Sequence, residues 1–233
     1  MKTRYFVMDT ETGGLQVEDG VVEVGWVELD AQANIIDQRE SLIDPGTGFI
    51  CPSASGVHGI TMGMVADKPT LDEFFSIADG TCYGKPIEAD QIVFIAHKAD
   101  FDLKFLSPHL QGEVLQVCTL RWARHLWPDC PNHTLGCLKY ALNLRRDAGD
   151  AHRVMSDIMV TYDLLRLILT TLGVSLDELA ERSKQPMMLH RIPFGKFKGE
   201  HPSAMDRNYI RWALNNMKEI DIDLRHTLEQ SLK

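Results

Sequence analysis

The chain lacks the features that mark membrane, repeat and disordered proteins. No apolar run reaches the roughly 18 residues that a membrane span needs, and the longest apolar stretch, 159–172, is interrupted by Thr161, Asp163 and Arg166. Internal repeats and low-complexity tracts are absent from the sequence as well. With 44% hydrophobic and 24% charged residues, the composition excludes intrinsic disorder and indicates a folded protein.

Cysteine is sparse, and export signals are missing. The five cysteines stand at scattered positions without a Cys-x-x-Cys pair, which argues against a zinc or redox site. The apolar part of the N-terminus is too short for a signal peptide, and Asp9 interrupts it. We therefore expect a cytoplasmic protein with reduced thiols and no membrane partner.

The chain also lacks an excess of positive charge. Its 24 Lys+Arg face 33 Asp+Glu, and this net charge of −9 argues against a protein that coats nucleic acid by bulk attraction. The imbalance is uneven, because residues 1–175 carry a net −10 and residues 176–233 a net +1. An enzyme that holds a nucleic-acid chain end locally remains compatible with these charges.

Hydrophobic periodicity predicts an α/β domain followed by a small module. Strands at 4–8, 21–29 and 35–43 are close enough in sequence to form an antiparallel meander. Further strands are expected at 91–96 and 114–118, and helices at 64–79, 100–106, 120–126 and 151–172. Together they predict a mixed five-stranded sheet flanked by helices in domain 1–175, with a C-terminal module at 186–233.

Two carboxylates follow the first predicted strand. Asp9 and Glu11 are two residues apart, so on a strand they point to the same face. Two such acids beside a core strand are costly unless a cation pairs with them, and oxygen ligands favour Mg²⁺ or Mn²⁺ over Zn²⁺. The alternative is a strand that has left the core, so that both acids lie exposed in a loop.

Two later segments place acids in comparable positions. Asp100 suits the N-cap of the helix after strand 91–96. Asp102 lies inside that helix, where capping does not explain a carboxylate. His152 opens the last long helix and Asp157 follows about 1.4 turns later. Alternatively, Asp157 pairs with a nearby arginine, and His152 is an ordinary core or surface histidine. Four carboxylates can hold two Mg²⁺ ions for in-line phosphoryl displacement, and a nearby histidine can accept a proton from water.

These motifs resemble those of the DEDDh 3′→5′ exonucleases, the group of proofreading epsilon subunits and ribonuclease T. The matching runs are Asp9-x-Glu11, His97-x-Ala99-x-Phe101-Asp102, His152-x-x-x-x-Asp157 and the segment Val57-His58-Gly59-Ile60-Thr61. Arg153 stands where a sister subgroup has tyrosine, which indicates the histidine type. The resemblance covers residues 4–172 and implies a ribonuclease H-like exonuclease fold. Further runs at 124–128, 192–199 and 209–212 resemble a bacterial exodeoxyribonuclease branch of this family.

The resemblance implies a role for each motif residue. Two Mg²⁺ ions, replaceable by Mn²⁺, would be bound by Asp9, Glu11, Asp102 and Asp157, and His152 would be the general base. Contacts with the substrate are expected from Thr10, Thr12, Gly14, Leu15, His58, Lys98 and Phe101. Leu15 would press against the terminal bases, and Lys98, where the family usually has Asn, can contact a phosphate.

The implied activity is that of a hydrolase that removes 5′-mononucleotides from the 3′ ends of single-stranded or duplex DNA, in repair or recombination. An exoribonuclease of the ribonuclease T or oligoribonuclease type uses the same five residues, so RNA stays open as a substrate. A proofreading subunit bound to a polymerase is a third possibility. In the C-terminal module, basic residues interleave with Phe194, Phe197, Tyr209 and Trp212, which suits single-stranded nucleic acid or, alternatively, a small aromatic core.

Overall fold

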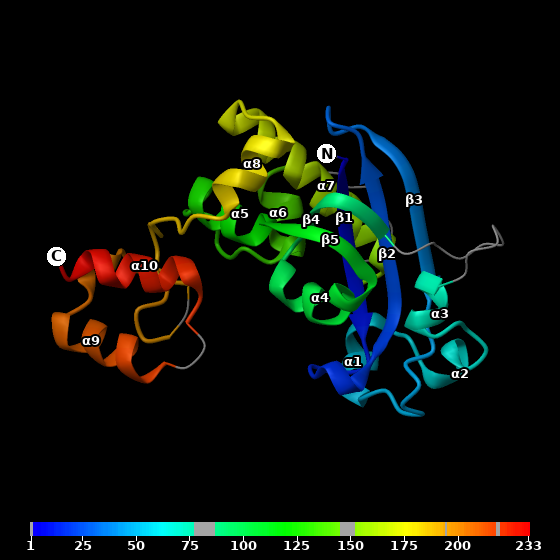
Figure 1. The fold of residues 1–233 in the computed structure, drawn as a ribbon. Helices are drawn as coiled ribbons and strands as arrows, with labels where there is room; N and C mark the ends of the chain where they lie inside the picture. Colours follow the sequence, from blue (N-terminus) through cyan, green and yellow to red (C-terminus); the bar gives the residue numbers. More distant parts are fainter. Residues whose placement is uncertain (1, 77–86, 145–151, 194, 218–219) are drawn as a thin grey trace.

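A single mixed sheet organises the first three quarters of the chain. The computed structural model describes residues 2–76, 87–144, 152–193, 195–217 and 220–233 (Figure 1). Its five strands lie in the order β3-β2-β1-β4-β5. The antiparallel meander is formed by β1 (Thr3–Thr12), β2 (Val21–Leu29) and β3 (Ile35–Leu42), and two parallel strands continue the sheet, β4 (Ile87–Ala96) and β5 (Leu110–Cys118). The predicted mixed five-stranded α/β sheet is confirmed.

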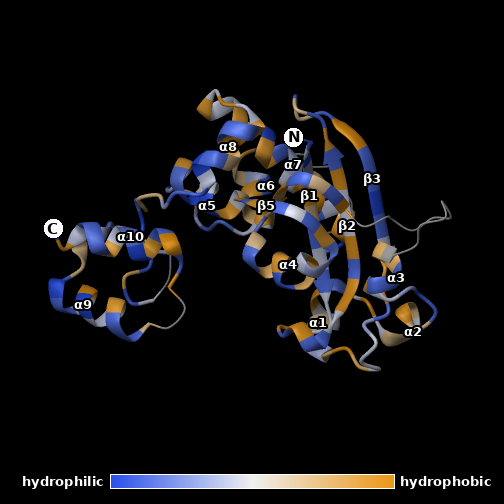
Figure 2. Ribbon diagram, viewed as in Figure 1, coloured by the Kyte–Doolittle hydropathy of each residue, from blue (hydrophilic) through white to orange (hydrophobic). Residues whose placement is uncertain are grey.

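The central strands are apolar on both faces because each face is covered. On β1, Val7 lies opposite Val27 of β2 and beside Ile95 of β4, and these residues belong to one core. The neighbouring residues Phe6 and Phe94 face the other side and belong to a second core. The edge strand β3 is largely exposed and rich in polar residues, which colour it mostly blue in Figure 2.

Helices cover both faces of the sheet. The core around Val7 is closed by α5 (Thr119–Leu126), α6 (Leu135–Ala141), α7 (Val154–Leu172) and α8 (Leu176–Ser183). The opposite core is closed by α3 (Leu71–Ser76) and α4 (Ala99–Leu106). Two short helices, α1 (Pro52–His58) and α2 (Met62–Val65), pack on the start of β2. Single 3₁₀ turns occur at Val17–Asp19, Ser107–His109 and Pro202–Ala204.

Three predicted helix boundaries were wrong. The expected helix 64–79 is split into α2 and α3, because Pro69 disfavours a helical conformation at the residue before it; residues 77–79 lie outside the described ranges. The expected helix 151–172 begins at Val154, since His152 has a left-handed φ of 62°; residue 151 is not described. The N-cap position of α4 is Lys98 rather than Asp100. Helices α1, α6 and α8 and the helices of the C-terminal residues were not predicted.

The C-terminal residues form a lobe with a small core of its own. Helices α9 (Arg207–Asn216) and α10 (Ile222–Ser231) bury Ile210, Leu224 and Leu228 together, and Figure 1 shows this lobe lying beside α5. Tyr209 and Phe197 pack partly against this core, whereas Trp212 is 52% exposed. Helix α8 packs within the sheet-side core, which therefore continues beyond residue 175. The division into 1–175 and 186–233 stays a prediction.

Within the described ranges, no single helix has both the length and the apolar character needed to cross a membrane. Helices α7 and α8 meet that test of length and composition only when they are taken together, and the chain bends by 90° between them.

Candidate active site

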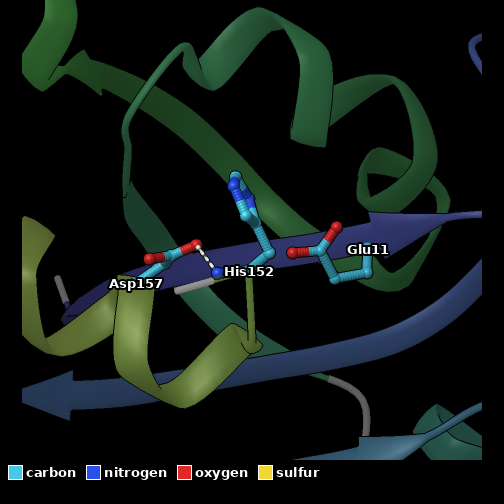
Figure 3. Close-up of side chains that lie close together, drawn as sticks. All are labelled: Glu11, His152 and Asp157. Atoms are coloured by element: carbon cyan, nitrogen blue, oxygen red, sulfur yellow. Dashed lines mark hydrogen bonds between the residues drawn. The ribbon is translucent and has the colours of Figure 1, made fainter. Parts of the chain in front are cut away.

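Side chains from β1 and from the start of α7 meet at one end of the sheet. Glu11 lies near the end of β1, His152 lies just before α7, and Asp157 lies in the first turn of that helix. Each offers a ligand atom within 4.8 Å of the others. Figure 3 shows the carboxyl groups of Glu11 and Asp157 directed toward each other, with His152 between them. Glu11 and His152, which are 141 positions apart in the sequence, are thus neighbours in the fold.

Helix α4 brings a further carboxylate to β1. Asp102 is 3% exposed, and its Oδ1 accepts hydrogen bonds from the backbone N–H of Thr10 (3.1 Å) and from the Thr10 hydroxyl (2.8 Å). Thr10 lies between Asp9 and Glu11, so these bonds hold the Asp102 carboxyl beside the β1 pair. The exposed-loop alternative for Asp9 and Glu11 is therefore excluded, because β1 stays paired with β2 through both residues.

Burial disfavours the ionised forms of all four carboxyls, and repulsion between carboxylates adds to this at Asp9 and Glu11. Burial, followed by repulsion from Asp102 and Asp157, raises the pKa of Asp9 well above its usual range. Burial and the same kind of repulsion raise the pKa of Glu11 to about 8. Burial raises the pKa of Asp102 to about 7 against the two Thr10 bonds, and it raises the pKa of Asp157 as well. Such a cluster of hard oxygen ligands is the environment that divalent cations neutralise.

The segment before α7 presents His152 to this cluster. His152 is exposed, and its left-handed backbone turns the chain immediately before the helix begins. Its backbone N–H donates to Asp157 Oδ2 at 3.2 Å, so the same carboxylate shapes the turn and faces the site. The imidazole remains accessible from solvent, as a group that exchanges protons with water must be.

Two residues of β2 support the site and were missed by sequence reasoning. Glu23 is 2% exposed, and its carboxylate accepts hydrogen bonds from the Arg153 guanidinium (2.6 Å at the closest) and from the Val154 backbone N–H (3.2 Å). Gly25 pairs with Asp9, and a Cβ atom there would lie 2.5 Å from Val154 Cγ1. A charged residue and a glycine inside the apolar strand 21–29 were the available signals.

The hydroxyls of Thr10 and Thr12 in β1 donate hydrogen bonds to other groups of the protein. Thr10 donates to Asp102, and the Thr12 hydroxyl donates to the carbonyl of Gly14 at 2.6 Å. His58 is buried; its Nε2 donates to the Thr12 carbonyl (3.3 Å) and its Nδ1 accepts from the Ile60 N–H (3.0 Å). Burial lowers the pKa of His58, so the imidazole is neutral and holds the end of β1 through its bond to Thr12. Contact of Thr10, Thr12 and His58 with substrate stays a prediction.

The other predicted substrate residues lie in the turn after β1 and at the start of α4. Leu15 is 74% exposed at the tip of the turn after β1. Gly14 allows that turn to close, because a Cβ atom there would lie 2.3 Å from Asp19 Oδ2. Lys98 is exposed in a left-handed conformation before α4, and its Nζ lies 5.4 Å from the centre of the Phe101 ring. Their contacts with substrate also stay predictions.

The motif histidine His97 has a structural position. Its Nε2 donates to the carbonyl of His133 at 2.9 Å, and its Nδ1 lies 3.0 Å from the hydroxyl of Thr119. Burial lowers the pKa of His97 to about 4, so the ring is neutral. It connects the end of β4 to the beginning of α5 and to the loop that precedes α6.

Fold and site together define the class of the protein. The chain belongs to the exonuclease family, whose model, described as Exonuclease, matches residues 6–165. It is 32% identical over 232 residues to exodeoxyribonuclease 10 of Escherichia coli (strain K12), and that alignment covers 97% of this chain and 98% of the relative.

Two further similarities agree with this assignment. A solved structure of exonuclease X in complex with 5′ overhanging duplex DNA is 27% identical, with a TM-score of 0.60, and the match covers 77% of this chain and 99% of that one. The epsilon subunit of DNA polymerase III from Treponema pallidum (strain Nichols) is 30% identical, over 69% of this chain and 74% of the relative. The likeness to exodeoxyribonuclease 10 is the more extensive one, because it runs through the C-terminal lobe.

Proposed function

We propose that this protein is a Mg²⁺-dependent 3′→5′ exodeoxyribonuclease that releases 5′-mononucleotides from DNA ends. The observation that carries the proposal is the convergence of Asp9, Glu11, Asp102 and Asp157 with His152 at one end of the sheet. DNA is favoured over RNA as the substrate by the end-to-end similarity to an exodeoxyribonuclease. A role in DNA repair or recombination, which the motif resemblance implies, is part of the same proposal.

The four carboxyls fit a pair of divalent cations. All ligands are oxygen atoms. Burial raises their pKa values, with added repulsion from neighbouring carboxylates at Asp9 and Glu11, and bound cations would relieve this cost of ionisation. Asp9, Glu11, Asp102 and Asp157 would hold the ions, with Mn²⁺ able to replace Mg²⁺. When bound, such ions stabilise negative charge on the attacked phosphate and on the leaving oxygen.

His152 would accept the proton of the attacking water. The water oxygen forms a bond to the terminal phosphorus, the bond to the 3′-oxygen of the preceding nucleotide breaks, and that oxygen takes a proton from solvent. Glu11, His152 and Asp157 each offer a ligand atom within 4.8 Å of the others, so this base would lie beside the carboxylates. The ion pair between Arg153 and the buried Glu23 holds the turn before α7 against β2, so the imidazole would be positioned before substrate arrives.

The test compares 5′-labelled single-stranded DNA with RNA of the same sequence, each with Mg²⁺ and with excess EDTA. We expect a descending ladder on DNA with Mg²⁺ only. A faster ladder on RNA would assign the protein to the exoribonucleases. Failure to cleave either strand would contradict an autonomous enzyme and favour a subunit that works on a polymerase.

The role of His152 is tested separately. The variant His152→Ala should lose about 10²–10⁴-fold in rate while it still binds Mg²⁺, because it removes a proton acceptor and none of the carboxylates. Single-turnover rates and calorimetric Mg²⁺ titration would measure the two properties. A rate within a few-fold of the unmodified protein would contradict the assignment.

A further inference from the structure

A cavity of about 710 Å³ lies between the sheet region and the C-terminal lobe. One wall is formed by Arg124 of α5 and the 128–135 segment, and the other by residues 191–193 and 198–199 of the C-terminal lobe. His97 and Lys98 contribute to the same cavity from the end of β4. A site in this size range (roughly 300–1,000 Å³) holds a molecule as large as a few nucleotides.

The charge of this cavity is opposite to that of the protein. Among the described residues that line it, four are lysines or arginines, namely Lys98, Arg124, Arg191 and Lys198, whereas Asp129 is the one carboxylate. Asp129 is paired with Arg191 at 2.6 Å, and Arg124 lies 3.6 Å from Asp221 of the lobe, so the four cations face two carboxylates. In a chain with a net charge of −9, this local excess of cations indicates an anionic occupant.

The cavity also has apolar surfaces between its cations. These are supplied from both walls by Leu120, Pro128, Pro131, Leu135, Ile192 and Pro193. Alternating cations and apolar faces suit a single nucleic-acid strand, because phosphates meet the cations while exposed bases lie on the apolar surface. A paired duplex would hide its base faces from such walls.

The cavity adjoins the carboxylate site through α4. Lys98 lines the cavity and directly precedes this helix, and Asp102 lies in its first turn. His97 anchors the 128–135 wall to the end of β4 through its bond to the His133 carbonyl. Lys98 is thus the residue that a strand with its 3′ end at the carboxylates would pass on its way into the cavity.

We propose that this cavity holds the single-stranded DNA segment upstream of the terminal nucleotide, with its phosphates on Arg124, Arg191 and Lys198. The proposal rests on the proposed exonuclease function, and it gives the C-terminal lobe a task as the second wall of the substrate path. The lobe is held in place for that task by Arg121 of α5, which donates to both oxygens of Asp223 (2.7 Å each) and to the Ser183 carbonyl (2.9 Å).

The test compares a long substrate with one too short to reach the cavity. Lys198→Glu and Arg124→Gln are assayed on a 15-nucleotide DNA strand and on the p-nitrophenyl ester of thymidine 5′-monophosphate. The control variant is Arg225→Glu, which changes an exposed arginine of α10 that is not among the residues lining the cavity. Circular dichroism and thermal melts confirm that each variant is folded.

We expect KM for the 15-mer to rise about tenfold in Lys198→Glu, and the salt dependence of log KM to weaken by about one unit for each cation removed. The loss should be confined to the long substrate and absent from Arg225→Glu. An unchanged KM in both cavity variants, or equal losses on both substrates, would overturn the proposal. A larger loss on blunt duplex than on single strands would assign the cavity to duplex DNA instead.

A binding measurement separates this proposal from the proposed function. Anisotropy of a labelled 15-mer is followed in EDTA, with and without Lys198→Glu. If the protein shows no nuclease activity but Lys198→Glu weakens DNA binding, the proposed DNA site in the cavity is supported and the proposed function is overturned. Nuclease activity with unaltered binding would retain the function and overturn the cavity.

Discussion

The sheet region and the C-terminal lobe use charge in opposite ways. In the sheet region, Asp102 and Glu23 are buried, and each is held by hydrogen bonds from a neighbouring element. In the lobe, the cations Lys196 and Lys198 are exposed around a small apolar core. Catalytic carboxylates need a rigid, desolvated frame, whereas contacts with a flexible polyanion need charges that stay hydrated and adjustable.

The largest expected effect tests the buried side of this comparison. Asp102→Asn should reduce activity on the order of 10³-fold or more, because it removes one ligand charge from the cluster. Asp100→Asn is the matched control on α4, since Asp100 is exposed and accepts a hydrogen bond from Gln116 at 2.6 Å. Single-turnover hydrolysis of labelled DNA measures both variants. Similar rates for Asp102→Asn and Asp100→Asn would contradict a special role for the buried carboxylate in hydrolysis.

The close approach of α7 to the sheet gives the next effect. Gly25→Ala should destabilise the protein by about 1–3 kcal/mol, because the added methyl group meets Val154 Cγ1 at 2.5 Å. The displaced α7 carries Asp157, so activity should fall by up to about 10²-fold.

The control for this variant is Gly136→Ala on α6. Nothing lies within 4 Å of a Cβ atom at that position, so we expect helix propensity to make it neutral or stabilising by up to about 1 kcal/mol. Urea unfolding and kcat measure both variants. Wild-type activity in Gly25→Ala would refute the idea that this contact positions the site.

The third effect concerns the ion pair between Arg121 and Asp223, which holds the C-terminal lobe on α5. Arg121→Ala removes the guanidinium that pairs with the buried Asp223 carboxylate, which keeps its hydrogen bond from the Met187 N–H. The free energy of unfolding should fall by about 3 kcal/mol, because a buried charge loses its partner. KM for long strands should rise, while hydrolysis of the thymidine ester changes little. The control Arg182→Ala breaks an exposed i,i+4 pair with Glu178 and should cost about 0.5 kcal/mol. Limited proteolysis of the lobe, unchanged in Arg121→Ala, would contradict this link.

The smallest effect is a pH dependence of stability without metal. The folded protein raises the pKa of Glu11 to about 8 and of Asp102 to about 7, above ordinary carboxyl values of about 4. The folded state therefore binds more protons than the unfolded state between about pH 4 and 8, and stability falls as pH rises through that window.

Thermal melts in EDTA should show this as a Tm a few degrees lower at pH 8 than at pH 6. Mg²⁺ should reduce the difference, and Glu11→Gln should do the same without metal, because each removes the cost of ionising Glu11. An equal pH dependence in Glu11→Gln would contradict the assignment to this residue.

Much of the site could be predicted because its residues stand in short motifs. Asp9, Glu11 and Asp102 follow strands whose apolar patterns are plain, and the spacing of His152 and Asp157 is specific. The supporting residues could not be predicted in the same way. Arg153 and Glu23 are 130 residues apart, and no local pattern states which distant charge will meet which.

The sequence by itself determined the continuous apolar runs that make the central strands apolar on both faces, the glycine that ends α7, and the acids that mark the family. Tertiary structure decided which groups are desolvated and which chain segments meet. It turned Thr10 toward Asp102, packed α7 against Gly25, and placed Arg191 and Lys198 of the lobe around the same cavity as Arg124. The physical reason is that periodicity is a local property, whereas burial and ion pairing depend on distances between segments that only the packed fold brings together.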